Sequence, residues 1–544
     1  MARTGNSSGR LELTWSNKDQ RLLAHDDVTY EWVDPSDWRV SEVRLLDKVA
    51  THGDSPEDNL LIQGDALHAL EALTSIPEYA DRYLGKVRQV VIDPPFNTGQ
   101  SFQQYDDSLE HSVWLTMLRD RLVQIHRLLA DDGSVWVHLD DAEQHRARCV
   151  LDEVFGSENF IATVLWQKIH ARNNSAVHLS ADHDFIHVYA KSRSAWHRNR
   201  LPRSAKSDAD FWNPDNDPRG LWRRSDLTAA KPYEEGHYTV VGPHGEEFQP
   251  RSNRPWAVSR STFDALVADN RIWWGKSGRS FPFRKRFATE LGDLVPTTIW
   301  LNTETGNNRE AKAEMRHLFG RGNAFATPKP ERLLERIIHI GSDPGDIVLD
   351  CFAGSGTTAA VAHKMGRRWV TVELSGDTVD TFVRPRLKKV VAGSDPGGIT
   401  DAVIWQGGGG FIEAKVAPSM FEQVGSNVVL SDWAVNGQLA EAVAAQLKFT
   451  QEQHGPFVGR RGRTRLAVLD GMLTTGLAEH LVGHLGEQET VVVVAMAMEE
   501  GVAEHLRALR PGSRARKVPR DLARSGKIPP RLVRLGGATD GGTT

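Results

Sequence analysis

The strongest constraint on the fold of this 544-residue chain is an alternation of short apolar segments with amphipathic helical segments, which occurs twice. It covers residues 59–155 and resumes over residues 328–373. Apolar segments such as 59–63 and 87–92 are typical of parallel strands that are buried on both faces. Helices between such strands cover both sides of one sheet. The pattern therefore predicts an α/β fold with a doubly wound, mostly parallel sheet to which both stretches contribute.

A region of different composition separates the two stretches. Eight of the 16 tryptophans lie between Trp166 and Trp300, among many Pro, Gly and Arg residues, which predicts an inserted module. The alternation returns over residues 426–524 and predicts a small C-terminal α/β domain. We predict an N-terminal arm (1–40), the first half of the main domain (41–165), the insertion (166–325), the second half (326–392), a linker (393–425), the C-terminal domain (426–535) and a disordered tail (536–544).

The charges are distributed unevenly along the chain. The net charge is −5, but residues 160–329 carry 26 Lys and Arg against 18 Asp and Glu, so this region has a net charge of +8 and the remainder −13. A basic region in an acidic chain is expected where only one part must lie against phosphates. We expect nucleic-acid contacts, with a solvated basic face as the alternative, from Arg219, Arg223, Arg224, Arg271, Lys276, Arg284, Lys285 and Arg286.

The composition also bears on the cellular compartment. The sequence contains no apolar run of 18 residues, and its first residues lack a hydrophobic signal core, so we expect neither secretion nor a membrane partner. The two cysteines, Cys149 and Cys351, and the 21 histidines show no metal-ligand spacing, so no metal site is expected. These features predict a cytoplasmic protein, and DNA binding would associate it with the nucleoid.

A Gly-rich segment, Asp350-Cys351-Phe352-Ala353-Gly354-Ser355-Gly356-Thr357, connects a predicted strand (346–350) to a predicted helix (357–365). Backbone N–H groups and the helix N-terminus of such a turn face a ligand, and the glycines allow close approach. The next predicted strand ends at Glu373, whose carboxylate can accept hydrogen bonds from two ribose hydroxyls. The segment predicts a nucleoside cofactor, although a tight turn in another α/β enzyme would have the same form. The G-x-G-x-x-G pattern of dinucleotide sites is absent.

The segment Asp93-Pro94-Pro95-Phe96 follows the predicted strand at 87–92. Its prolines end strand pairing and hold the Pro94 carbonyl rigidly outward. The lone pair of an exocyclic base amine is delocalised into the ring, so methylation requires acceptors for both N–H groups. The Asp93 carboxylate and the Pro94 carbonyl can supply these acceptors, and Phe96 offers a face for an extruded base. These four residues are the predicted catalytic residues. A turn that merely ends the strand is the alternative.

Together the two segments resemble those of the β-class DNA amino methyltransferases, in which the catalytic motif also precedes the cofactor motif. Residues 59–161 and 254–373 resemble the modification (Mod) subunits of type III restriction-modification systems. The resemblance implies a Rossmann-like methyltransferase fold, with circularly permuted motif order and an inserted target-recognition domain. Phe96 stands where the family usually has Tyr. The resemblance rests on Gly64-Asp65, residues 93–99, Asp140-Asp141, Phe155-Gly156, residues 159–161, residues 328–332 and residues 352–358.

The resemblance also implies a cofactor, partners and a reaction. The cofactor is S-adenosyl-L-methionine, and the reaction is N6 methylation of adenine in double-stranded DNA, in a restriction-modification or phage-defence system. The partners are a helicase-nuclease subunit, since the chain has no P-loop, and a second copy of the chain. Alternatives are N4 methylation of cytosine, a DNA-reading subunit with secondary methylation, and an RNA substrate. The implied cofactor pocket contains Asp65, which could equally cap a helix, Lys329, Asp350, Phe352, Ala353, Gly354, Ser355, Gly356, Thr357 and Glu373.

Overall fold

The chain forms two compact units in the computed structural model. The larger unit comprises the residues up to Asn199 and from Thr297 onward, and the smaller unit is Arg200–Pro296. The predicted tail lies outside the described residues. The structure describes residues 12–24, 30–35, 37–54, 59–98, 100–101, 106–107, 109–171, 174, 176–203, 208–250, 254–320, 325–424, 427–432, 434, 436–518 and 522.

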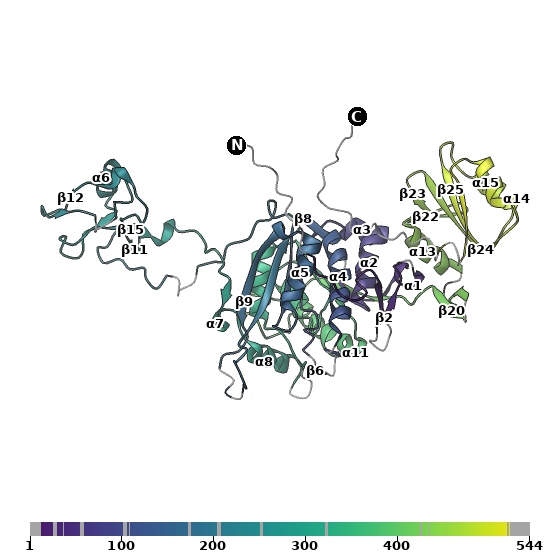
Figure 1. Cartoon of the computed structure of the whole chain (residues 1–544), viewed down its shortest axis with the longest axis horizontal. Coiled ribbons are helices and arrows are strands. Elements are labelled where there is room, and N and C mark those ends of the chain that lie inside the picture. The colour runs from purple at the N-terminus through teal and green to yellow at the C-terminus, as the bar shows by residue number, and fades with distance from the viewer. Residues whose placement is uncertain are drawn as a thin grey trace. The chain divides into compact units, whose positions relative to one another are not determined.

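A ten-stranded sheet organises the larger unit (Figure 1). Its six central strands, β8, β5, β17, β18, β4 and β19, are parallel to one another, and antiparallel pairs lie toward both margins. The predicted mostly parallel sheet is therefore confirmed. In spatial order the strands are β16 (Ile299–Trp300), β9 (Phe160–Gln167), β10 (His183–Ala190), β8 (Leu129–Leu139), β5 (Val87–Ile92), β17 (Ile347–Asp350), β18 (Arg368–Glu373), β4 (Leu60–Gln63), β19 (Gly410–Val416) and β3 (Leu46–Gly53).

Helices cover both faces of this sheet. The helices α2 (Ala66–Ser75), α4 (His111–Leu128) and α5 (Gln144–Phe155) lie over one face, where they share a buried cluster with Val90, Ile92 and Leu349 of the strands (Figure 1). The helices α9 (Glu331–Gly341), α10 (Thr357–Lys364) and α12 (Arg384–Val391) pack together away from this cluster. Fully burying each such Val or Leu side chain stabilises the fold by roughly 1.5–3 kcal/mol, so the apolar strands favour a sheet covered on both faces.

The connections of the sheet place a crevice between β5 and β17. From β5 the chain passes through α4 to β8 on one side, and from β17 it passes through α10 to β18 on the other side. Strand order therefore reverses between these two neighbours, where Leu349 lies opposite Val90. Open α/β sheets bind ligands outside the carboxyl ends of strands at such a point. The residues after Ile92 and Leu349 consequently emerge side by side.

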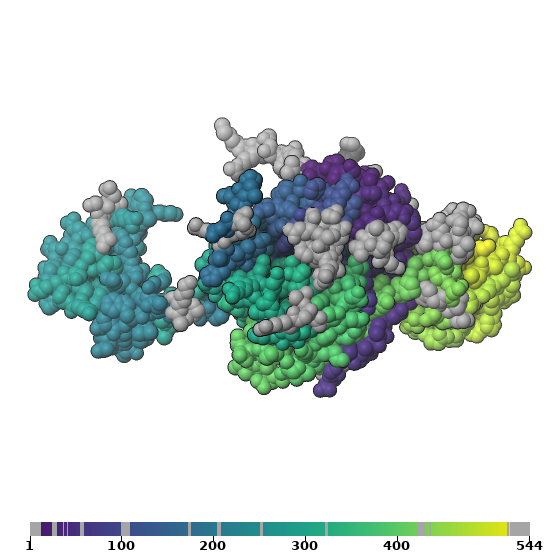
Figure 2. Space-filling view, turned by 90° about the horizontal axis from the view of Figure 1, so that it is seen from below, coloured from purple at the N-terminus to yellow at the C-terminus, as the bar shows by residue number. Residues whose placement is uncertain are grey.

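The sheet extends further than the sequence predicted. The stretch 393–425 was expected to be a linker, but β19 within it pairs with β4 and β3. The glycines before residue 410 suggested a loop, so the strand Gly410–Val416 was not predicted. This strand lies between β4 and β3, which come from much earlier in the chain. Figure 2 shows residues near the N-terminus, in purple, beside green residues from this later part of the chain. The insertion is also shorter than the expected 166–325, since the strand β16 after it returns to the sheet next to β9.

The smaller unit, Arg200–Pro296, is built from short strands around aromatic side chains. Trp222, Trp273 and Phe287 form one buried cluster, and Trp256 and Phe263 belong to another. The tryptophans concentrated in this region therefore supply its cores. Its elements are β11 (Trp222–Ser225), β12 (Val240–Val241), β13 (Glu247–Phe248), α6 (Arg260–Ala268), β14 (Ile272–Trp273) and β15 (Phe283–Phe287).

The C-terminal part contains the expected α/β arrangement, a five-stranded sheet in which the last three strands are parallel. No described helix of the chain combines the length and the apolar character that a membrane crossing requires. The C-terminal elements are α13 (Asn436–Leu447), β22 (Thr450–His454), β23 (Phe457–Arg461), β24 (Thr464–Leu473), α14 (Thr475–Gly483), β25 (Thr490–Met498), α15 (Val502–Leu509) and β26 (Arg514–Lys517).

Candidate active site

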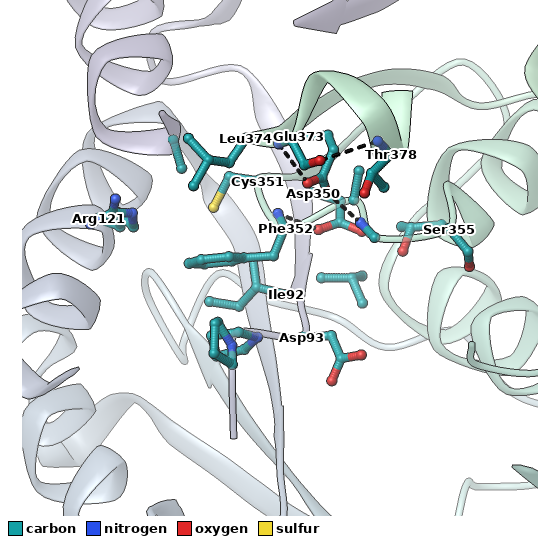
Figure 3. A pocket seen from close by; sticks show the side chains of 18 of the residues that line it. Ile92, Asp93, Arg121, Asp350, Cys351, Phe352, Ser355, Glu373, Leu374 and Thr378 are labelled. Carbon is teal, nitrogen blue, oxygen red and sulfur yellow. Dashed lines mark hydrogen bonds between the residues drawn. The ribbon is translucent and has the colours of Figure 1, made fainter. Parts of the chain in front are cut away.

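A cavity of about 830 Å³ opens at the carboxyl ends of the parallel strands in the larger unit. Its walls include the Asp93 segment after β5, the Gly-rich turn after β17 and the residues after β18 and β4 (Figure 3). The predicted catalytic and cofactor-binding residues therefore share one site, although more than 250 residues separate Asp93 from Gly354. The cavity is lined by Asp65, Asp93, Pro94, Pro95, Phe96, Lys329, Asp350, Phe352, Ala353, Gly354, Ser355, Thr357 and Glu373, among others.

The Asp93–Phe96 segment is held in place from the α4 side. The buried Trp114 indole donates a hydrogen bond of 2.6 Å to the Pro95 carbonyl. Beyond Phe96 the backbone of Asn97 has a φ of +62°. The side-chain Nδ2 of Asn97 donates a hydrogen bond of 2.8 Å to Oε1 of Glu143. An Asn tolerates this left-handed conformation better than most residues. Prolines and these hydrogen bonds together fix the direction of the segment at the mouth of the crevice.

Asp93 has two oxygens in different surroundings. Oδ2 lies 2.5 Å from Nζ of Lys329, which approaches from the segment before α9. Oδ1 is buried and has no hydrogen-bond partner among the residues that the structure describes. A buried acceptor without a partner is unfavourable by about 1–3 kcal/mol, and such groups are uncommon in native proteins unless a ligand supplies the partner. The Asp93 carboxylate can therefore accept a hydrogen bond from a bound molecule.

The Gly-rich turn depends on two left-handed glycines. Gly354 has a φ of +52°, and a Cβ atom there would lie 3.3 Å from Cζ of Phe325. Gly356 has a φ of +73° and directly precedes α10. Asp350 shapes the start of the turn by accepting the N–H of Phe352 at 2.9 Å. Burial raises the pKa of Asp350 to about 7, with a further rise from the charge of Asp93, against hydrogen bonds from Thr358 and Phe352.

Glu373 closes the turn from the next strand. Its Oε2 accepts the N–H of Gly354 at 2.8 Å, and its Oε1 accepts the N–H of Ser375 at 3.0 Å (Figure 3). Burial raises the pKa of Glu373 to about 7 against the effect of these backbone hydrogen bonds. A carboxylate has about four lone-pair positions, so Glu373 can still accept hydrogen bonds from two hydroxyls of a ligand. This geometry fits the ribose-binding role that was expected of it.

A buried ion cluster supports the back of the turn. Arg386 donates to Oγ1 of Thr357 at 2.7 Å and to the carbonyl of Ser355 at 3.3 Å. Glu331 accepts from Arg386 at 2.8 Å and from Lys364. Sequence reasoning did not assign roles to Glu331 and Arg386. The position of Glu331 in the Pro-Lys-Pro-Glu-Arg motif was a signal, but no pattern paired it with an arginine 55 residues later.

Asp65 lies in the cavity wall at the end of β4, in a more restricted role than expected. Its Oδ1 accepts the N–H of Leu67 and caps α2, and its Oδ2 accepts from the buried Arg121 at 2.6 Å. Burial favours the neutral form of Asp65, but the charge of Arg121, the interaction with His68 and the N–H groups of Leu67 and His68 together lower its pKa. Asp65 is therefore a helix cap in the structure, and its role as a cofactor ligand stays a prediction.

A polar network that the sequence did not indicate lies behind Phe96. The His138 ring is 5.6 Å from the Phe96 ring, and its Nε2 lies 3.1 Å from Oδ2 of Asp184. Lys168 donates to the other oxygen of Asp184 at 2.6 Å. Burial opposes ionisation of Asp184, but the His138 hydrogen bond and the nearby cations lower its pKa to about 2. The network fixes the wall against which the Phe96 ring rests.

The basic candidates of the smaller unit divide into residues that are partly or fully buried, most of them paired with acids, and residues that are exposed. Lys285 is 1% exposed and pairs with Asp215 and Asp217, so the expected phosphate contact at this residue does not fit the structure. Arg219 and Arg271 are bound to acidic neighbours within the unit. Arg284 is half-buried on β15. The exposed candidates are Arg223, Arg224, Lys276 and Arg286, of which Arg223 and Arg286 lie directly opposite each other on β11 and β15.

Comparisons with known proteins match much of the chain. A family model described as DNA methylase matches residues 87–384. The Mod subunit of the type III restriction-modification enzyme StyLTI from Salmonella typhimurium is 32% identical over 61% of this chain and 57% of its own length. The DNA adenine methyltransferase YhdJ of Escherichia coli is 46% identical over 60% of this chain and 82% of its own length. The chain spans a little more than half the length of the type III Mod subunits that it matches first.

Solved structures give a weaker likeness. The cytosine-N4-specific PvuII DNA methyltransferase is 15% identical to this chain, with a TM-score of 0.34. The match covers 66% of this chain and 94% of the PvuII enzyme chain. A score of this size establishes no common fold.

Proposed function

The chain belongs to the DNA methylase family, and from this premise we propose that it transfers a methyl group from S-adenosylmethionine to the N6 amine of adenine in double-stranded DNA. One observation carries the proposal: a proline-fixed carboxylate and a Gly-rich turn emerge from neighbouring strands into the same cavity. The relative named as a DNA adenine methyltransferase supports adenine as the base. The YhdJ likeness covers 60% of this chain.

The residues around the turn fit the cofactor. Gly354 lines the cavity with a φ of +52°, and its missing side chain leaves space for the Phe325 ring beside the turn. Glu373 offers acceptors for ribose hydroxyls, the Phe352–Thr357 turn would hold the methionine part, and Asp65 faces the adenine end. S-adenosylmethionine supplies an electrophilic methyl group when it is bound.

The Asp93 segment would prepare the target amine. Oδ1 of Asp93 and the carbonyl of Pro94 can accept the two N–H groups of the amine, which draws its lone pair out of conjugation with the ring. Phe96 would hold the base by stacking. After methylation of the amine nitrogen, its surplus proton would pass along the hydrogen bond to Oδ1 of Asp93 and from there to solvent. Positioning and a preorganised acceptor are expected to supply most of the acceleration.

The wider role is proposed from the relatives named as type III Mod subunits. We propose that the protein marks DNA sites within a restriction-modification or phage-defence system. Its partners would be double-stranded DNA, a helicase-nuclease subunit and a second copy of the chain. Exposed Arg223, Arg224, Lys276 and Arg286 of the smaller unit are the proposed phosphate contacts.

The proposal is tested by supplying the purified protein with labelled S-adenosylmethionine and unmethylated plasmid DNA. Labelled N6-methyl-2′-deoxyadenosine after enzymatic digestion of the DNA is the expected product, and positional mapping of the modified bases would give the recognised sequence. N4-methylcytosine would correct the target base while keeping the enzyme class. Incorporation into RNA but not into DNA, at equal salt, would refute a DNA substrate.

A further inference from the structure

Lys329 contacts two of the predicted catalytic residues. Its Nζ lies 2.5 Å from Oδ2 of Asp93 and 4.9 Å from the centre of the Phe96 ring. The side chain is largely buried, with 13% exposed, and comes from the segment directly before α9, 236 residues after Asp93. An ammonium over an aromatic face next to a carboxylate is held by both groups. Lys329 therefore links the two ends of the Asp93–Phe96 segment.

This position differs from the cofactor-binding role that the sequence suggested for Lys329. Glu373 accepts the N–H groups of Gly354 and Ser375. Lys329 instead contacts Asp93 and the Phe96 ring. The side chain consequently acts on the part of the cavity that would receive the base.

We propose that Lys329 is a positioning residue for the target base: its ammonium fixes one oxygen of Asp93 and leaves Oδ1 for the target amine. The inference rests on the proposed function and deepens it. Because Oδ2 is bound to Lys329, the carboxylate cannot rotate freely, and its unpartnered oxygen keeps a single direction.

The charges around Asp93 explain why a cation is needed there. Asp350 on β17 is the nearest acid of the Gly-rich turn, and its charge and that of Asp93 disfavour each other. Asp184 on β10 adds a further negative charge, but it is bound by His138 of β8 and by Lys168. Lys329 is the cation that contacts Asp93 among the described residues. Without it, Oδ2 of Asp93 would lose its ion-pair partner, and the carboxylate could turn away from the direction that aims Oδ1 at the target amine.

The test compares Lys329→Met, Lys329→Gln and Lys329→Arg with wild type and with Lys388→Met. Lys388 is exposed on α12, so its variant makes the same charge change away from Asp93. Titration calorimetry with S-adenosylmethionine alone measures cofactor affinity and shows that each variant folds. Single-turnover methyl transfer to DNA, at saturating cofactor and DNA, measures the chemical step.

We expect Lys329→Met and Lys329→Gln to transfer methyl groups at least about tenfold more slowly at neutral pH, with cofactor affinity within about twofold of wild type. Lys329→Arg should recover part of the rate, because an arginine can also donate to Oδ2 of Asp93. Unchanged rates would overturn the inference and leave the proposed function intact, provided that Asp93→Ala is inactive in the same assay. A loss of cofactor affinity with a normal saturated rate, or a Lys329→Arg variant as slow as Lys329→Met, would also overturn it.

Discussion

The loops after β5 and β17 leave neighbouring strands at one edge of the sheet, but they are held in different ways. The Asp93 loop is rigid through two prolines and the Trp114 hydrogen bond, and its carboxylate keeps an oxygen without a partner among the described residues. The Gly-rich loop bends through left-handed glycines. Two acids at strand ends, Asp350 of β17 and Glu373 of β18, accept backbone N–H groups of this loop.

The difference shows how one sheet edge can carry two tasks. A carboxylate that accepts N–H groups of the adjacent loop fixes the shape of a concave surface. It contributes to ligand binding through its remaining lone pairs. A carboxylate with an unused oxygen beside a rigid carbonyl can bind a reacting amine. Loss of the first kind of acid should weaken cofactor binding, and loss of the second kind should slow methyl transfer.

The largest expected effect follows removal of the unused acceptor. Asp93→Ala should lower the rate of methyl transfer by about 10³-fold or more, because it removes an oriented acceptor from the target amine. Cofactor affinity should change by less than about threefold, since the Gly-rich loop does not depend on Asp93. Single-turnover transfer of labelled methyl to DNA and cofactor titration measure the two quantities.

The exposed Asp141, at the carboxyl end of β8, provides the matched control. Asp141→Ala removes an acidic side chain at the same edge of the sheet and should retain nearly full activity. Full activity of Asp93→Ala would falsify the catalytic role of the segment and remove the contrast between the loops.

A smaller effect, on binding, is expected at the other loop. Gly354→Ala places a Cβ 3.3 Å from the Phe325 ring at a φ of +52°, which costs roughly 1–2 kcal/mol of backbone strain. Cofactor affinity should fall by about tenfold or more, since 1.4 kcal/mol corresponds to a factor of ten. Gly345→Ala separates strain from crowding, because Gly345 has a φ of +88° with open space around it. Equal affinities for both variants and wild type would exclude a ligand from the loop.

The pH dependence of cofactor binding tests the proposed role of Glu373, whose carboxylate already accepts two backbone N–H groups. Burial raises the pKa of Glu373 from 4.5 to about 7, so its ionised form becomes dominant only above neutral pH. If ribose hydroxyls donate to the carboxylate, affinity should rise by about tenfold between pH 6 and 8, and the rise should be absent in Glu373→Gln. Calorimetry in buffers of different ionisation enthalpy would detect the proton released on binding.

The same shift has a consequence for stability. Between pH 4.5 and 7 the folded state binds more protons at Glu373 than the unfolded state does, so this group destabilises the cofactor-free fold as pH rises through that window. A melting temperature that falls less steeply with pH in Glu373→Gln is the expected result. An identical slope in both proteins would contradict the raised pKa.

The sequence predicted the parts of the fold that depend on local pattern. The segments 87–92 and 357–365 became β5 and α10 almost residue for residue, because an apolar run and a glycine turn specify local geometry. Residues 410–416 were missed as a strand, since their pairing with β4 and β3 depends on contacts across hundreds of residues. Long-range pairing leaves no mark in the local sequence.

In the candidate site, too, the residues of local motifs were predicted and the contacts between distant segments were not. Motif spacing located Asp93, Gly354 and Glu373, and their meeting in one cavity follows from the order of parallel strands. The Lys329–Asp93 contact and the Arg386 support of the turn could not be predicted, because each joins segments that only the folded chain brings together. The expected phosphate contact at Lys285 does not fit the structure, because this lysine is buried beside Asp215 and Asp217. A count of charges along the sequence cannot reveal that burial.

The smallest expected effect tests whether rigidity itself distinguishes the Asp93 loop. Trp114→Phe removes the hydrogen bond to the Pro95 carbonyl and keeps most of the buried ring. Methyl transfer should slow by about five- to tenfold, since one hydrogen bond contributes about 1 kcal/mol to holding the loop, while cofactor affinity stays unchanged. Trp405→Phe removes an equivalent indole-to-carbonyl bond, to Val390, and should leave the rate unaltered. If both variants lose the same fraction of activity, the loss reflects general stability, and the prolines alone account for the rigidity of the loop.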